Sequence, residues 1–453
     1  MNISGKTFIL GTLWNHPSAA SIAKGLQARG ATLLKKEEVI ARAKGSMESL
    51  RALVVSGIIL PSAEKTQDNE WMAAFFHCPI YNELDLAQKL SPTPIIAITG
   101  TNGKTSTTEM VALCLRSLQK NVGLFYNFER SILEIEDADF AVTECWSAQL
   151  ETSQTFRPQI SVLLNIEPDH IEQHGSLARY VETKRQIFIN QRKPDALVFN
   201  ADCALTRKIV LKYAPKSLRL IAFSCKTPKP STGEILFLKK NQVFYRRGKK
   251  TVTLGSFESL PFFGNHMQSN RLAVLAVGVA LGLKTQKFFE IFAKYQLQPH
   301  RQEIFEVQKP ICFVNDAISS GFHSARIALQ RFMIDEWSKR KPLVWLTGGR
   351  DKQFPQKAIA EFVAWYAKNQ KKCKPKATLI LLGHFSNFEK ELKRQRVSFL
   401  KVSTLSEGVT KAATILRKNG TLLFSPVGAA DDLFNEYDDR GQAFQQVVRL
   451  IFK

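Results

Sequence analysis

The sequence predicts an α/β protein of three domains, each built around a largely parallel β-sheet. Its 453 residues suffice for two to four domains of ordinary size. Short apolar runs alternate with helical patterns along most of the chain, which is typical of βαβ units. A hydrophobic fraction of 44% and a charged fraction of 23% are those of globular domains.

The lengths of the apolar runs predict where the protein is located. None approaches the ~20 residues that span a bilayer, and the N-terminus lacks the long apolar segment of a signal peptide. Seven cysteines occur without any C-x-x-C pair, which favours reduced thiols over a disulfide framework or a zinc site. We therefore expect a cytoplasmic protein without membrane insertion.

The net charge of +23 attracts anions of any kind, including nucleotides and nucleic acid. The lysines cluster in short runs rather than in one basic arm. Solvated faces are therefore the favoured interpretation, with a nucleic-acid surface as the alternative. We expect no required nucleic-acid partner.

The first predicted domain covers residues 1–91. Strands are expected at 7–10, 31–34 and 53–55, with a helix at 18–29. The turn after the first strand lacks the G-x-G-x-x-G pattern of dinucleotide sites. Two prolines in 91–94 mark a hinge, because proline restricts both itself and the residue before it.

The central domain is predicted at 92–299 and the third at 300–453, with the junction at Pro299-His300. In the third domain the predicted strands alternate with helical patterns, as in the first two. These strands are expected at 312–315, 343–347, 378–382 and 421–425.

A phosphate-binding loop is the strongest local signal. A buried strand at 95–99 precedes a glycine-rich turn, and a helix is expected at 107–119. Such a turn directs backbone N–H groups and the positive end of the helix dipole at a phosphate. Lys104 would reach the β- and γ-phosphates, and the Thr105 hydroxyl would bind Mg²⁺. The predicted ATP-binding residues of the loop are Gly100, Thr101, Asn102, Gly103, Lys104, Thr105 and Ser106.

Polar residues follow the next two predicted strands. Glu144 ends the strand 139–144, where a carboxylate beside a phosphate loop would hold Mg²⁺. The strand 161–166 leads into Asp169-His170, and Lys184 lies fourteen residues beyond His170. Taken alone, His170 is more often a structural histidine and Lys184 an exposed helix cation.

Several ordered motifs together resemble the Mur ligase superfamily. The loop G-T-N-G-K-T at 100–105 resembles its phosphate loop, and C-W-S-A-Q-L-E at 145–151 resembles a stretch of its D-glutamate-adding members. P-H-R-Q-E at 299–303 and G-G-R-D-K at 348–352 resemble motifs of its third domain. S-P-V-G-A-A-D-D-L-F at 425–434, followed by Tyr437 and Arg440-Gly441, resembles the C-terminal signature of the D-glutamate-adding members. The resemblance covers about residues 95–450.

The resemblance implies a small Rossmann-like N-terminal domain that binds a UDP substrate, a central P-loop ATPase-like domain and a Rossmann-like C-terminal domain that binds an amino acid. The implied enzyme is a monomeric ATP-dependent ligase that forms an acyl phosphate and joins D-glutamate to a UDP-muramoyl-peptide substrate in peptidoglycan synthesis.

The resemblance also assigns site residues. It implies two Mg²⁺ ions held by Thr105, Glu144, His170 and Lys184, with Lys184 carbamylated. The implied catalytic residues are Lys104, Glu144, His170, Lys184 and Arg301. Asn270, Arg301 and Asp316 would contribute to ATP binding. The implied substrate-binding residues are Asn127, Ser320, Lys352 and Tyr437.

Departures from the family motifs keep two alternatives open. Ile318 and Ala430 stand where the family has lysine and serine, and Met267 and Ala317 also differ from the usual residues. A related ligase adding another amino acid is therefore one alternative. A non-catalytic nucleotide- or nucleic-acid-binding relative is the other, suggested by the net charge of +23 and by the weak resemblance of residues 1–90 to the family.

Overall fold

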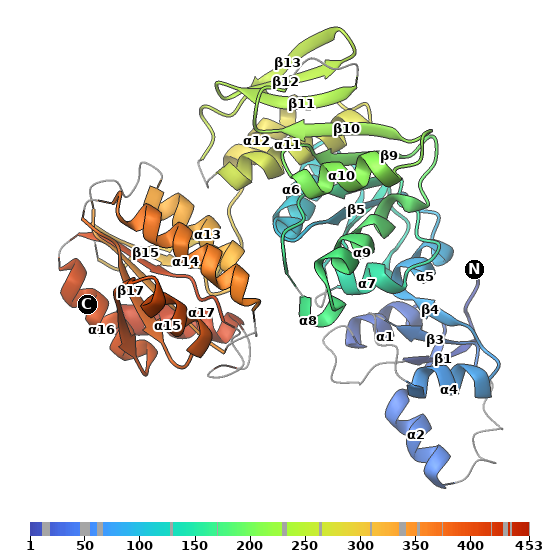
Figure 1. Cartoon of the computed structure of the whole chain (residues 1–453). Coiled ribbons are helices and arrows are strands. Elements are labelled where there is room, and N and C mark those ends of the chain that lie inside the picture. The colour runs from blue at the N-terminus through green and yellow to red at the C-terminus, as the bar shows by residue number, and fades with distance from the viewer. Residues whose placement is uncertain are drawn as a thin grey trace. The chain divides into compact units, whose positions relative to one another are not determined.

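The computed structural model describes residues 1–10, 19–45, 55–60, 67–126, 130–169, 171–228, 233–261, 265–308, 310–334, 341–350, 354–373, 375–417, 419–428, 434 and 437–452. The chain divides into two compact units (Figure 1). The N-terminal unit comprises Met1–Pro261 and Met267–Tyr295, and the C-terminal unit comprises Phe262–His266 and Gln296–Lys453. The predicted domain boundaries at 91/92 and 299/300 stay predictions.

The N-terminal unit begins with a four-stranded parallel sheet of order β2-β1-β3-β4. Its strands are β1 (Thr7–Leu10), β2 (Thr32–Lys35), β3 (Gly57–Leu60) and β4 (Ile80–Asn82). Its helices are α1 (Ala19–Gln27), α2 (Lys36–Gly45), α4 (Gln67–Phe75) and α5 (Glu83–Leu90).

The prediction of a strand at 53–55 is wrong for Val55, which is the described residue of that range. Residues 53 and 54 lie outside the described residues, Val55 belongs to no strand, and β3 pairs with β1 from Gly57 onward. The apolar run continues to Leu60, and hydrophobicity alone does not determine where strand pairing begins within such a run.

A nine-stranded sheet forms the rest of this unit, in the order β13-β12-β11-β10-β9-β8-β5-β7-β6. Strands β5 to β11 run parallel to one another, whereas β12 and β13 are each antiparallel to the strand before them. The strands are β5 (Ile95–Thr99), β6 (Val122–Phe125), β7 (Phe140–Glu144), β8 (Ile160–Leu163), β9 (Ala196–Asn200), β10 (Arg219–Ser224), β11 (Glu234–Lys239), β12 (Gln242–Arg247) and β13 (Lys250–Ser256).

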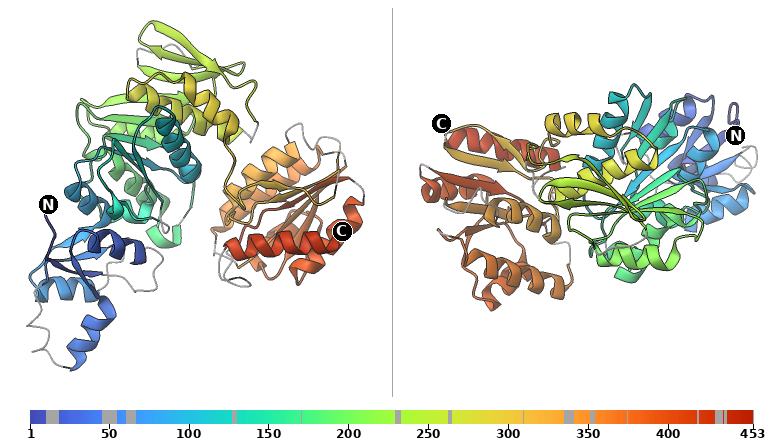
Figure 2. Two further views of the ribbon diagram at one scale, coloured as in Figure 1. Left: turned by 180° about the vertical axis from the view of Figure 1, so that it is seen from behind. Right: turned by 90° about the horizontal axis from the view of Figure 1, so that it is seen from above.

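Helices cover both faces of this sheet (Figures 1 and 2). The helices are α6 (Lys104–Ser117), η1 (Ile132–Glu134), α7 (Ser147–Thr152), α8 (Ile171–His174), α9 (Leu177–Ile189), α10 (Ala204–Tyr213), α11 (Asn265–Ala280) and α12 (Gln286–Lys294). Every residue of β5, β8 and β9 is buried, as expected for parallel strands enclosed by helices. The three strands therefore read as continuous apolar runs in the sequence.

A shared core and buried polar contacts fix the small sheet to the large one. Apolar side chains from both, including Phe8 and Phe156, belong to one buried cluster. Glu83 accepts hydrogen bonds from Ser131 at 2.5 Å and from Gln149 at 3.0 Å. Ser153 donates to Asp85 at 2.8 Å. Burial raises the pKa of Glu83, so this carboxyl group is held in a poorly solvated interface.

The C-terminal unit contains a six-stranded sheet of order β14-β15-β19-β16-β17-β18, parallel except for β14. Its strands are β14 (Glu303–Phe305), β15 (Ile311–Asn315), β16 (Leu343–Gly348), β17 (Thr378–Leu382), β18 (Phe399–Val402) and β19 (Gly420–Phe424). Its helical segments are α13 (Phe322–Leu329), η2 (Gln330–Ile334), α14 (Gln356–Gln370), α15 (Ser386–Arg394), α16 (Leu405–Leu416) and α17 (Tyr437–Ile451). Two buried clusters contain alternate residues of its strands.

The predicted α/β class, with a small N-terminal sheet, a central sheet carrying the glycine-rich loop and a C-terminal sheet, is confirmed. All seven cysteines are described and none forms a disulfide. Within the described ranges, no helix is long and apolar enough to cross a membrane.

Candidate active site

The glycine-rich loop follows the central strand β5 and leads directly into α6. Gly103 adopts φ +86° as the residue before the helix, a left-handed conformation that favours glycine. A Cβ atom at Gly103 would also lie 2.6 Å from Oδ1 of Asn270 on α11. The helix begins at Lys104, earlier than the predicted residue 107, because the left-handed Gly103 ends the turn.

Asn165, just beyond β8, braces the loop and was not identified from the sequence. Its Oδ1 accepts from the Asn102 N–H at 2.9 Å, and its Nδ2 donates to the Asn102 carbonyl at 2.8 Å. Its own carbonyl accepts from the Thr101 N–H at 2.9 Å. Only its place at the end of a buried strand signals this function in the sequence.

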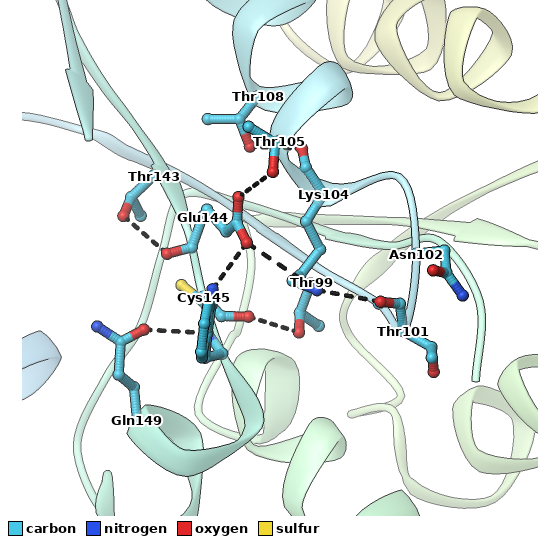
Figure 3. Close-up of polar contacts among 12 residues, drawn as sticks. Thr99, Thr101, Asn102, Lys104, Thr105, Thr108, Thr143, Glu144, Cys145 and Gln149 are labelled. Atoms are coloured by element: carbon cyan, nitrogen blue, oxygen red, sulfur yellow. Dashed lines mark hydrogen bonds and ion pairs between the residues drawn. The ribbon is translucent and has the colours of Figure 1, made fainter. Parts of the chain in front are cut away.

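Glu144 lies at the carboxyl end of β7, next to the first turn of α6 (Figure 3). Its Oε2 accepts from the Thr105 hydroxyl at 2.8 Å, and its Oε1 accepts from the Trp146 indole at 2.7 Å. The Lys104 ammonium lies 3.9 Å from Oε1 and donates to the Thr101 carbonyl at 3.1 Å. Two hard oxygen donors and a cation therefore converge at the start of the helix.

This convergence follows from topology. Strands β5 and β7 are parallel neighbours, with Ile98 paired to Glu144, so both strands deliver their next residues to the same edge of the sheet. Among the residues that the structure describes, no three His, Cys, Asp or Glu side chains form a metal-binding group. Thr105 and Glu144 nevertheless have the oxygen chemistry that Mg²⁺ prefers, and nucleotide phosphates usually supply further ligands.

Lys184 is buried under the loop, with 1% of its surface exposed. Its ammonium donates to the Gly100 carbonyl at 3.0 Å and to the Thr99 hydroxyl at 3.4 Å, and it lies 4.8 Å from the centre of the Tyr180 ring. Desolvation, with a contribution from the nearby charge of Lys104, lowers its pKa well below the ordinary lysine value. The expectation of an exposed helix cation is wrong.

Tyr180, one helical turn before Lys184 on α9, is a second residue that sequence reasoning missed. Its hydroxyl lies 3.1 Å from the Thr101 hydroxyl, which also accepts from the Glu167 N–H at 2.9 Å. The i, i+4 spacing of Tyr180 and Lys184 was the available signal, because such residues share one face of a helix.

Three predicted site residues, Asn127, His170 and Lys352, lie outside the described residues. The structure therefore brings together Lys104, Thr105 and Glu144 directly, and places Lys184 against the Gly100 carbonyl. Asn270 lies against Gly103, as described above, and is 5% exposed.

The C-terminal unit has its own polar cluster at the carboxyl end of β15. Asp316 is buried and accepts from the Ser425 hydroxyl at 2.7 Å and from the Gln302 N–H at 3.1 Å. Desolvation raises its pKa to about 7, although the charge of Arg301 opposes this. The Nε of Arg301 is buried without a hydrogen-bond partner among the described groups.

Arg301 lies on a tightly shaped turn. Both neighbours, His300 (φ +60°) and Gln302 (φ +47°), adopt left-handed conformations that non-glycine residues rarely occupy. Gly441 lies so close to the His300 ring that a Cβ there would be 2.3 Å from Nδ1. Strained backbone that surrounding contacts enforce is typical of functional turns.

The two predicted substrate-binding residues described in this unit differ in exposure. Ser320 is half-buried in the segment between β15 and α13, and Tyr437 is 40% exposed at the start of α17. Nearby Arg440 is buried and donates to the carbonyls of Gly428, Ala317 and Ser319. Arg440 therefore joins the segments that carry the predicted residues.

Comparison with known proteins was consistent across sequence and structure. Residues 98–278 match the Mur ligase middle domain family. A UDP-N-acetylmuramoylalanine--D-glutamate ligase of Pelodictyon phaeoclathratiforme is 30% identical over 384 residues, covering 82% of this chain and 79% of the relative. A ligase of the same name from Chlorobium chlorochromatii is 27% identical over 488 residues, covering 100% of both chains.

Two solved structures share the fold. A pseudomurein peptide ligase type C from Methanothermus fervidus has a TM-score of 0.62 at 14% identity, covering 98% of this chain and 100% of that one. A UDP-N-acetylmuramate-alanine ligase from Thermotoga maritima has a TM-score of 0.59 at 19% identity, covering 97% and 98%.

Proposed function

The chain belongs to the Mur ligase family of ATP-dependent, amide-bond-forming ligases, and on that premise we propose that it joins D-glutamate to UDP-N-acetylmuramoyl-L-alanine in peptidoglycan synthesis. The single observation that carries the proposal is the meeting of Lys104, Thr105 and Glu144 at the mouth of the glycine-rich loop. The names of the relatives support D-glutamate as the added amino acid. We propose that the enzyme acts as a cytoplasmic monomer.

The proposed reaction has two steps. A carboxylate oxygen of the muramoyl substrate attacks the γ-phosphorus of ATP, so that a new oxygen–phosphorus bond forms, the bond to the β-bridging oxygen breaks, and ADP leaves. The amine of D-glutamate then attacks the acyl carbon, phosphate leaves with the electron pair of the carbon–oxygen bond, and the nitrogen loses a proton. Lys104 would offset negative charge on the phosphate oxygens in the first step.

The oxygen donors near Lys104 fit a magnesium ion. We propose that Thr105 and Glu144 hold one Mg²⁺ and that His170 and Lys184 help to hold a second. Bound Mg²⁺ would reduce repulsion between the phosphate oxygens and the incoming carboxylate. The Trp146 indole would orient Glu144 by its 2.7 Å hydrogen bond.

We propose that Lys184 carries a carbamate in the working enzyme. In this modification the neutral amine attacks carbon dioxide, a nitrogen–carbon bond forms, and the nitrogen loses one proton, which leaves an anionic side chain. The burial of Lys184 against the Gly100 carbonyl supports the assignment, because an unmodified ammonium there is poorly solvated. A carbamate is an oxygen ligand suited to Mg²⁺.

Further residues are proposed to bind the two substrates. Gly100 to Ser106 and Asn270 would surround ATP, and Arg301 and Asp316 would contribute from the C-terminal unit. The buried, unpartnered Nε of Arg301 supports a clamp on phosphate. Asn127, Ser320, Lys352 and Tyr437 are proposed to contact the muramoyl and amino-acid substrates.

ADP release tests the proposal. ATP with UDP-N-acetylmuramoyl-L-alanine should give sustained ADP release only when D-glutamate is added. A panel of other amino acids distinguishes a related ligase, which the Ile318 departure allows. Absence of turnover with every amino acid would contradict a ligase function.

A matched pair of lysine variants tests the loop. Lys104→Ala should reduce turnover by at least about 100-fold without unfolding the chain, because it removes the charge nearest the proposed phosphates. Lys120→Ala removes a partly exposed lysine that pairs with Asp139 three residues after the same helix, and it should leave turnover unchanged. Equal rates for Lys104→Ala and the wild type would refute the assignment.

A further inference from the structure

Nearly half of the net charge of +23 comes from one segment. Residues 201–256 contain thirteen Lys and Arg side chains but only two Asp or Glu, in about an eighth of the chain. This segment contains α10, β10, β11, β12 and β13, and we call it the basic lobe. Its four strands make up one end of the nine-stranded sheet, with β13 at the edge (Figure 1).

The antiparallel end of the basic lobe is separate from the phosphate loop. Strand β13 is six positions from β5 in the sheet order, or about 30 Å at the usual strand spacing. The cations of β13 and of the turn before it are therefore too distant to contact ATP at the glycine-rich loop, and the proposed ligase reaction gives them no task.

Helix α10 presents a basic outer face with an apolar side chain within it. Thr206, Ile209 and Val210 are buried against the sheet, which leaves the opposite face to solvent. Leu211 is 72% exposed, more than any other large hydrophobic side chain in the described part of the chain. The exposed cations around it are Arg207, Lys208 and Lys212.

The antiparallel strands add cations at both of their turns. Lys239 and Lys240 are exposed where β11 meets β12, and Lys249 and Lys250 are exposed where β12 meets β13. Beside the second pair, Val252 on the edge strand β13 is 40% exposed.

The two acidic side chains of the lobe are already engaged. Glu234 accepts from Arg219 at 2.8 Å and from Tyr245 at 2.6 Å. Asp202 accepts from the Ser224 hydroxyl at 2.7 Å and from the Cys225 N–H at 2.7 Å. Two acidic side chains, one of which pairs with both Arg219 and Arg247, cannot balance thirteen cations, so the lobe keeps a large positive charge.

We propose that the basic lobe docks the protein on an anionic phospholipid surface. Clustered Lys and Arg side chains are attracted to anionic headgroups, and an exposed leucine among them can enter the boundary between headgroups and acyl chains. This is peripheral attachment, with no segment crossing the bilayer.

The apolar side chains favour lipid over nucleic acid. The exposed large hydrophobic residues of the lobe, Leu211 and Val252, are aliphatic, whereas single-stranded nucleic acid binds on open aromatic faces. Phe237 and Phe244 stack on each other with ring centres 5.4 Å apart, and Phe237 is only 7% exposed. These rings therefore offer no open platform for bases.

Vesicle sedimentation of the full chain tests the proposal. The wild type should bind vesicles containing about 30% phosphatidylglycerol, should not bind pure phosphatidylcholine, and should be released at about 1 M salt, where charges are screened beyond ~3 Å. Equal binding to both kinds of vesicle, or binding to neither, would overturn the proposal.

Two quadruple variants test whether the docking surface lies on the basic lobe. Lys208→Gln, Lys212→Gln, Lys249→Gln and Lys250→Gln together should weaken partitioning by at least about 100-fold, since each cation near an anionic surface contributes about fivefold. The matched control replaces four exposed lysines of the C-terminal unit by glutamine and should change binding by less than about twofold. The control positions are Lys357, Lys368, Lys371 and Lys372.

Further readouts separate the alternatives. Leu211→Ser should weaken vesicle binding by about tenfold, because the variant loses the favourable free energy of burying one leucine side chain. ADP release in solution should be unchanged in all three variants, which shows that they fold. The lipid proposal would be refuted if the wild type bound single-stranded RNA but no vesicles, and if the quadruple lobe variant lost the RNA binding.

Discussion

Replacing Asn165 by alanine tests whether this side chain holds the glycine-rich loop. The variant loses two hydrogen bonds to the backbone of Asn102, at 2.9 and 2.8 Å. Each such bond contributes about 1 kcal/mol, so the free energy of unfolding should fall by about 2 kcal/mol. The loop should also lose its fixed geometry, and we expect the KM for ATP to rise about tenfold, or about 1.4 kcal/mol.

A matched asparagine separates stability from loop geometry. Asn190, at the end of α9, donates to the carbonyls of Gln154 at 2.8 Å and Phe156 at 3.3 Å. Asn190→Ala should lower the free energy of unfolding by a similar amount and leave the KM for ATP unchanged. Urea unfolding followed by tryptophan fluorescence and steady-state ADP release measure the two quantities. If Asn165→Ala destabilises the chain but keeps the wild-type KM, the bracing argument is refuted.

Three further changes probe other parts of the fold. The pKa of Asp316 is raised to about 7 from 3.8, so the protonated carboxyl group stabilises the fold below about pH 4 and this stability is lost as the pH rises through 7. Asp316→Asn should therefore flatten the decline of the urea midpoint with pH. An unchanged slope of urea midpoint against pH would contradict the raised pKa. Gly441→Ala should destabilise the chain by about 2 kcal/mol through the clash with His300, and an unaltered urea midpoint would show that the ring moves freely. Tyr295→Phe removes a 2.6 Å hydrogen bond to Glu109 and should lower the free energy of unfolding by about 1.5 kcal/mol. A thermal unfolding midpoint equal to that of the wild type would contradict this.

Local patterns were sufficient to predict the phosphate loop and the neighbouring carboxylate. The buried strand before Gly100 and the helix after Gly103 are encoded within about twenty residues of sequence. Glu144 was predictable because parallel strands bring their carboxyl ends to one sheet edge. The structure confirms its contact with Thr105.

The remaining contacts depend on long-range packing. Taken alone, Lys184 resembled an exposed helix cation, and only the packing of α9 under the loop buries it against Gly100. Strand 53–55 was misplaced because a continuous apolar run does not reveal where pairing starts. The net charge of +23 was visible in the composition, but the arrangement of cations on α10 and at the turns of β11 to β13 was not.

The sequence by itself determined the class of fold, the glycine-rich loop and the residue types available for phosphate and magnesium chemistry, because short-range patterns encode strands, turns and helix starts. Only the tertiary structure decided that Asn165 braces the loop, that Tyr180 and Lys184 lie beneath it, and that Leu211 protrudes among cations. These facts arise from contacts between residues far apart in the chain, and their geometry depends on how whole sheets and helices pack.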